Sequence, residues 1–131
     1  MKCLSSFQRQ TDDRVHFESV FGDNVLMDKK AMLNEILAQN PKDAFARYGL
    51  AMEYAGRGET DASLMEFGRL LDEHPDYTAG YFMAAQTLAK AERSEEAKVR
   101  LTQGIACARR TGNQHALSEM QAMLDELEFA G

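Results

Sequence analysis

The apolar residues in the middle of the chain recur with helical spacing and are interrupted by turn residues. Four residues with the spacing i, i+3, i+4, i+7 begin this pattern: Arg47, Leu50, Ala51 and Tyr54. This spacing places them on one face of a helix. Gly56-Arg57-Gly58 is predicted to end that helix, because glycine adopts the left-handed conformation common at helix C-termini. Thr60 is predicted to cap a second helix, which ends before Pro75 and has the apolar positions Leu64, Phe67 and Leu71.

The same pattern returns after about 34 residues, a period typical of helix–turn–helix arrays. The first helix of this second unit has the positions Tyr81, Ala84, Ala85 and Leu88. Its second helix, which Ser94 is predicted to cap, has the positions Ala97, Leu101, Gly104, Ile105 and Ala108. The turn between them, Ala91-Glu92-Arg93, contains no glycine. One helix pair cannot bury its apolar stripe alone, so the sequence predicts an all-α array of stacked antiparallel pairs, residues 44–77 and 78–111.

These two units resemble the tetratricopeptide repeat (TPR) family. In the order of the family pattern, the first unit has Leu50, Ala51, Tyr54, Gly58, Ser63, Phe67, Leu70 and Pro75. The second unit has Tyr81, Ala84, Ala85, Leu88, Ala97, Leu101 and Gly104. It departs from the pattern at Glu92, where the family has glycine, and it lacks the final proline. The resemblance covers Asp28 to Glu128 and implies a short right-handed solenoid like that of small bacterial TPR proteins.

Two further helices are predicted to cap the array. The helix at 28–39 matches the second helix of a repeat unit, and the first helix of that unit is missing. Its predicted inward residues are Met32, Leu33, Ile36 and Leu37. The C-terminal helix at 113–128 has the inner stripe Ala116, Met120, Met123, Leu124 and Leu127 and a polar outer face, as a terminal repeat requires. The predicted helices are therefore 28–39, 43–56, 60–73, 77–91, 94–110 and 113–128, within a TPR-like domain at 27–131.

Residues 1–26 have no sustained hydrophobic period. They are predicted to form a poorly ordered or loosely packed arm. Met27 precedes Asp28, which is placed to cap the first helix. A further hypothesis is therefore that Met27 is the functional start of the protein.

Composition restricts the classes of partner. The chain has 131 residues, enough for one domain, a net charge of −6 and a pI near 5.0. This acidity disfavours binding to nucleic acid or to an anionic membrane, since both select for clustered Lys and Arg. No apolar run is long enough to cross a bilayer, and MKCLSSFQRQ lacks the apolar core of a secretion signal. We therefore expect a cytoplasmic protein whose two cysteines, Cys3 and Cys107, are reduced.

Candidate catalytic and metal-binding residues are few. His115 and Glu119 are spaced i, i+4, but no third ligand is evident near them. Asp61 occupies the place of the third glycine in a GxGxxG loop, so Gly56-Arg57-Gly58 is not a phosphate loop. No catalytic residue, metal site or cofactor is predicted, and the protein is not expected to be an enzyme.

The TPR resemblance implies that the first helix of each unit lines a concave groove. The corresponding residues here are Phe45, Tyr48, Met52, Ala55, Ala79, Phe82, Gln86, Ala89 and Lys90. This face is largely apolar, with Lys90 and Arg47 at its rim, and a second apolar face on a helix favours a partner. The alternative is that Phe45 and Tyr48 pack on the preceding helix and that Phe82 contacts Met52. Family members that bind chaperones hold a terminal carboxylate with Lys and Asn at these places. This chain has other residues at these places, so chaperone binding is not predicted.

The sequence thus predicts a protein–protein interaction module that binds an apolar peptide or helix. A structural homo-oligomer is the alternative, assembled through the groove or through Met120, Met123 and Leu127 of the C-terminal helix. The arm at 1–26, which contains Phe7, Phe17 and Phe21, could also occupy the groove.

Overall fold

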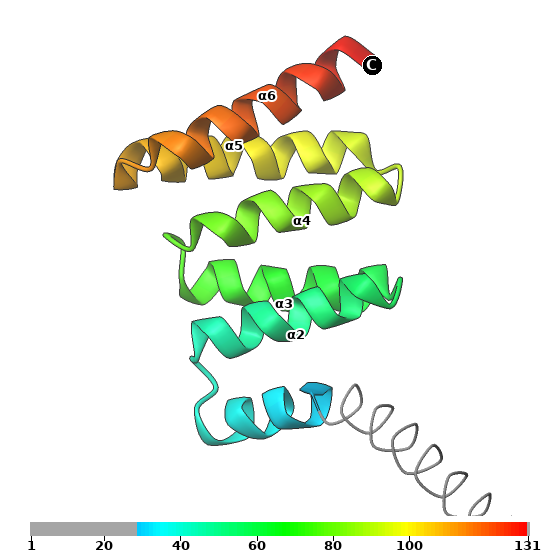
Figure 1. Ribbon diagram of the computed structural model, residues 1–131, viewed down its shortest axis with the longest axis vertical. Helices are drawn as coiled ribbons and strands as arrows, with labels where there is room; N and C mark the ends of the chain where they lie inside the picture. Colours follow the sequence, from blue (N-terminus) through cyan, green and yellow to red (C-terminus); the bar gives the residue numbers. More distant parts are fainter. Residues whose placement is uncertain (1–28, 131) are drawn as a thin grey trace, which may run out of the picture.

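Helices account for nearly all of the part of the chain that the computed structural model describes, residues 29–130. The first helix spans residues 29–39. The others are α2 (Ala44–Gly56), α3 (Thr60–Glu73), α4 (Thr78–Lys90), α5 (Ser94–Thr111) and α6 (Gln114–Ala130). Figure 1 shows them stacked along the long axis of the molecule, each antiparallel to the next. The predicted all-α repeat array is confirmed, and no strand occurs within residues 29–130. The predicted arm, the proposed start at Met27 and the cap at Asp28 lie outside the described residues.

The helix caps differ from the predicted ones. Thr60 and Ser94 are the first helical residues of α3 and α5, and the preceding Glu59 and Arg93 make no side-chain cap. The predicted caps are wrong because the carbonyl oxygens of Glu59 and Arg93 already accept the first helical hydrogen bonds. By contrast, Asp43 Oδ1 accepts a hydrogen bond from the backbone N–H of Ala46 at 2.9 Å and caps α2.

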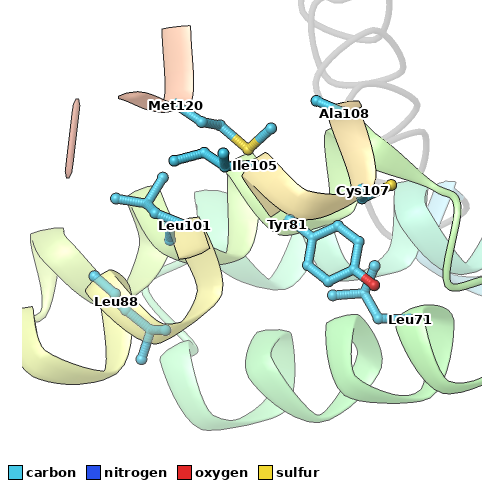
Figure 2. Packing of buried hydrophobic residues seen from close by; sticks show 10 residues of the cluster. Leu71, Tyr81, Leu88, Leu101, Ile105, Cys107, Ala108 and Met120 are labelled. Atoms are coloured by element: carbon cyan, nitrogen blue, oxygen red, sulfur yellow. The ribbon is translucent and has the colours of Figure 1, made fainter. Parts of the chain in front are cut away.

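The core follows the predicted stripes in most places. The buried apolar residues of the two units include Leu50, Ala51, Phe67, Leu71, Tyr81, Ala84, Ala85, Leu88, Ala97, Leu101 and Ile105. Figure 2 shows Met120 of α6 reaching down onto Leu101 and Ile105 of α5, with Tyr81 of α4 beneath. Tyr54 and Leu64 are only half-buried. Met120 is fully buried within the monomer, so it offers no surface to a second copy.

The tightest helix approach is at Gly104 of α5. A Cβ atom there would lie 2.7 Å from the Cβ of Tyr81 and closer still to Sδ of Met120. Both distances are shorter than non-bonded carbon and sulfur atoms tolerate. Glycine is therefore what allows α4, α5 and α6 to meet at this point.

A buried ion pair joins α2 to α3. Arg47 Nη1 lies 2.6 Å from Glu66 Oε2, and Arg47 Nη2 donates a hydrogen bond to the carbonyl oxygen of Pro41 at 2.9 Å. Both side chains are about nine-tenths buried. Arg47 therefore belongs to the inner stripe, and its predicted place at the rim of the groove is wrong. The carboxylate of Glu66 needs this partner because a buried charge is costly when unpaired.

The helix at 29–39 buries only part of its predicted inner stripe. Leu37 is buried and Leu33 is half-buried, packing with Leu50 of α2. Met32 and Ile36 are instead 60% and 41% exposed, so their predicted inward orientation is wrong. Within residues 29–130, α2 packs against the face of Leu33 and Leu37, and no helix lies against the face of Met32 and Ile36.

Glu92 is the only non-glycine residue with positive φ in the described part of the chain. Its φ is 62°, and it stands one repeat after Gly58, whose φ is 75°. A left-handed conformation costs a non-glycine residue roughly 1–2 kcal/mol, of which the greater freedom of unfolded glycine offsets about half. We therefore expect Glu92→Gly to raise the free energy of unfolding by about 0.5–1 kcal/mol in urea denaturation. Glu92→Ala retains the strained φ and should leave stability unchanged; equal gains from both variants would contradict this explanation.

Candidate functional site

A pocket between the C-terminal halves of α2 and α4 contains four of the nine groove residues predicted from the sequence. These are Met52 and Ala55 of α2 and Gln86 and Lys90 of α4. The pocket has a volume of about 360 Å³, and its lining also includes Met83, Thr87 and the turn glycines Gly56 and Gly58. Met52 and Met83 are half-buried and pack on the fully buried cluster below, which is Ala51, Phe67, Leu70 and Ala84. The floor of the pocket is therefore apolar and rests on the core.

Lys90 supplies the positive charge at the edge of this pocket. Its side chain is exposed, and within residues 29–130 it has no ion-pair partner. It is the last residue of α4, where a cation is favoured by the helix dipole. The ammonium group is consequently available to a ligand lying in the pocket.

The other five predicted groove residues lie elsewhere. Phe45 is 76% exposed near the start of α2, and Ala79 is exposed near the start of α4. Phe82 and Ala89 are half-buried against the cluster that α3, α4, α5 and α6 share. Tyr48 packs edge-on against Phe67, with the ring centroids 6.3 Å apart, and lies 5.3 Å from the ring of Tyr77. The structure thus does not bring all nine residues into one site.

Tyr48 and Tyr77 form an aromatic contact rather than a chemically active pair. Burial raises the pKa of Tyr48 above its usual value of 10.0. Burial also raises the pKa of Tyr77, with a smaller contribution from the neighbouring Tyr48. Both hydroxyls are therefore protonated at neutral pH, and their rings serve as packing surface.

Met83 and Thr87 line the pocket but are not among the groove residues predicted from the sequence. Together with Gln86 and Lys90 they follow the spacing i, i+3, i+4, i+7, so they form one face of α4. The Thr87 hydroxyl donates to the carbonyl oxygen of Met83 at 2.8 Å, which satisfies its hydrogen-bonding capacity within the helix. The same periodicity that identified the core stripe could have identified this face.

His115 and Glu119, which have the i, i+4 spacing of candidate metal ligands, form a contact at the surface. His115 Nε2 lies 2.9 Å from Glu119 Oε1 on α6. Within residues 29–130, no group of three or more His, Cys, Asp or Glu side chains is arranged to hold a metal ion. The side chain of His74 contacts the backbone instead: its Nε2 lies 2.7 Å from the carbonyl oxygen of Lys42. In the same part of the chain, no helix combines the length and apolar character needed to span a membrane.

Comparison with known proteins identifies the family of the repeats. No family model matches the chain. A curated TPR repeat-containing protein of Pseudomonas aeruginosa is 28% identical over 98 residues, which are 75% of this chain and 93% of that protein. The Yersinia enterocolitica type III secretion chaperone SycD, solved with a peptide of the translocator YopD, shares the fold at a TM-score of 0.73 and 14% identity, over 91% of this chain and 95% of that one.

A solved TPR domain supplies stronger sequence similarity. The solution structure of a tetratricopeptide repeat domain protein from Salinibacter ruber is 32% identical to this chain, with a TM-score of 0.66. The similarity covers 70% of this chain and 93% of the Salinibacter domain. Both the repeat pattern and the stacked helix pairs agree with this comparison, and the chain therefore belongs to the tetratricopeptide repeat family.

Proposed function

We propose that the chain is a non-enzymatic protein-interaction module that binds an apolar peptide or helix in the pocket between α2 and α4. The observation that carries this proposal is the meeting of Met52 and Ala55 from one unit with Met83 from the next, beside the exposed ammonium group of Lys90. The fold also supports it, since the Yersinia chaperone that shares the fold was solved with a bound peptide.

The binding mechanism is passive burial of apolar surface. Each Å² of apolar surface removed from water contributes roughly 25 cal/mol, before the cost of ordering the ligand. Met52 and Met83 have flexible, polarizable side chains that adapt to ligands of different shapes. The amide of Gln86 and the ammonium group of Lys90 supply hydrogen bonds that orient a peptide backbone.

Selection from a displayed library of random peptides tests the proposal. We expect the selected peptides to be rich in apolar residues and to bind Met83→Glu at least about tenfold more weakly than the parent chain, because a carboxylate would then face an apolar side chain. Fluorescence anisotropy with a labelled synthetic peptide measures this change. Val99→Glu is the matched control: it adds the same charge at an exposed position of α5, away from this pocket.

Two outcomes would overturn the proposal. One is equal affinity of the selected peptides for the parent chain and Met83→Glu, when both give the same circular dichroism and melting temperature. The other is a loss of affinity in Val99→Glu alone, which would place the ligand between α3 and α5. If a second copy occupied the pocket instead, sedimentation would show a mass that doubles with concentration and returns to the monomer value in Met83→Glu.

A further inference from the structure

The helix at 29–39 exposes apolar side chains at the end of the array. Met32 and Ile36 are four residues apart, so they lie on the same face of the helix. They are 60% and 41% exposed, whereas Leu37 of the neighbouring face is buried against α2. At the opposite end of the array, α6 buries Met120, and the residues it exposes are polar or alanine apart from Phe129, which is 95% exposed. A pair of exposed large apolar side chains on one helix face therefore lies at the N-terminal end.

The unit at residues 44–77 shows which helix covers the corresponding positions there. One repeat later, Met32 and Ile36 correspond to Glu66 and Leu70 of α3. Leu70 is fully buried in a cluster with Ala51 of α2, and Glu66 forms its ion pair with Arg47 of α2. Both positions of α3 are thus covered by the first helix of their own unit.

The second unit, residues 78–111, has the same arrangement. Ile36 and Leu70 correspond there to Gly104 of α5, which is buried and makes close contact with Tyr81 of α4. The position therefore contacts the preceding helix in both units that have one, and in the last unit it also contacts Met120 of α6. Within the described residues, no helix precedes 29–39, and the exposed face at Met32 and Ile36 lies where such a helix would pack.

The sequence before Lys29 is suited to that place. Phe17, Val20 and Phe21 have the spacing i, i+3, i+4, which gathers them on one face of a helix. Asn24 stands one repeat before Gly58, the turn residue with positive φ. Asparagine adopts the left-handed conformation more readily than most residues other than glycine. The order of an apolar helical face, a turn residue and a second helix is thus the order of the two later units.

We propose that the segment containing Phe17 and Phe21 packs across Met32 and Ile36 as the first helix of an additional repeat unit. The segment is covalently joined to the helix at 29–39, so its effective concentration at this face exceeds that of a second copy. A domain beginning at Met27 would leave the face uncovered. This inference is independent of the pocket between α2 and α4.

Thiol accessibility in the full-length chain tests the packing. In a Cys3→Ser background the remaining native thiol, Cys107, is buried. Ile36→Cys then reports on the covered face, and Met65→Cys, at a position 59% exposed on α3, reports on an open helix surface. We expect maleimide to react about tenfold more slowly at position 36 than at position 65, as for a face covered about 90% of the time.

Substitutions in the segment then identify the cover. Phe17→Asp combined with Phe21→Asp should raise the rate at position 36 to that at position 65, while Phe7→Asp, outside the stripe, should leave it slow. Circular dichroism verifies that α2 to α6 remain folded in each variant. Equal rates at positions 36 and 65 in the starting chain would overturn the proposal. So would slow labelling that persists in the double variant, or protection that disappears on dilution, which would indicate a second copy.

Discussion

Phe67→Ala is expected to lower the free energy of unfolding by about 3–5 kcal/mol. Phe67 is 0% exposed and packs between α2 and α4 with Ala51, Leu70 and Ala84. Its ring also receives the edge-on contact of Tyr48. Truncation leaves a cavity between two repeat units, and small domains have only about 5–15 kcal/mol of total stability.

Urea denaturation followed by circular dichroism measures this loss. Met65→Ala is the matched control, because Met65 lies on the same helix but is 59% exposed, and we expect it to cost less than about 1 kcal/mol. Tyr54→Ala should fall between the two, since Tyr54 is half-buried rather than fully buried as the sequence pattern predicted. Similar losses for Met65→Ala and Phe67→Ala would show that α3 does not bury the face described.

Gly104→Ala is expected to destabilise the protein by about 1–3 kcal/mol, the cost of overpacking a core. Alanine is intrinsically the better helix former by about 1 kcal/mol, so Gly104→Ala destabilises the protein only because the overpacking cost is larger than this gain. The new methyl group would meet the Cβ of Tyr81 at 2.7 Å and the sulfur of Met120 closer still. The Tyr81 Cβ is bound directly to the backbone of α4, so relief requires α4 and α5 to separate.

Gly68→Ala provides a control of opposite sign. At Gly68 of α3 the nearest atom to an added Cβ is Nη2 of Arg100, at 4.0 Å. The methyl group therefore fits, and the higher helix propensity of alanine should stabilise the protein by about 0.5–1 kcal/mol. Melting temperatures of the two variants should move in opposite directions. A rise in both would mean that α4, α5 and α6 approach less closely than the structure shows.

Several parts of the fold were predictable because they depend on local chemistry. The spacing of Leu50, Ala51 and Tyr54 requires only that an apolar stripe lie on one side of a helix. Gly58 and Pro75 mark turns because their own backbone restrictions act over one or two residues. The repeat period follows from these same signals, and it was sufficient to identify the family.

The buried ion pair was not predictable in the same way. Arg47 falls on the core stripe, but nothing near it in sequence indicates that Glu66, 19 residues later, is its partner. The pairing exists because α2 and α3 fold back on each other and bring the two side chains together. Glu66 stands between Met65 and Phe67, and no local feature indicates that its carboxylate is buried.

Periodicity and turn chemistry are properties of neighbouring residues, so the amino-acid pattern is enough to predict paired helices repeated at a constant interval. The face of α4 that lines the pocket with α2 depends instead on packing between distant parts of the chain. Phe82 and Met83 are adjacent in sequence, and successive helical side chains point about 100° apart. The rotation of α4 about its own axis, set by its contacts with α3, α5 and α6, directs Met83 to the pocket and Phe82 to the core near α6.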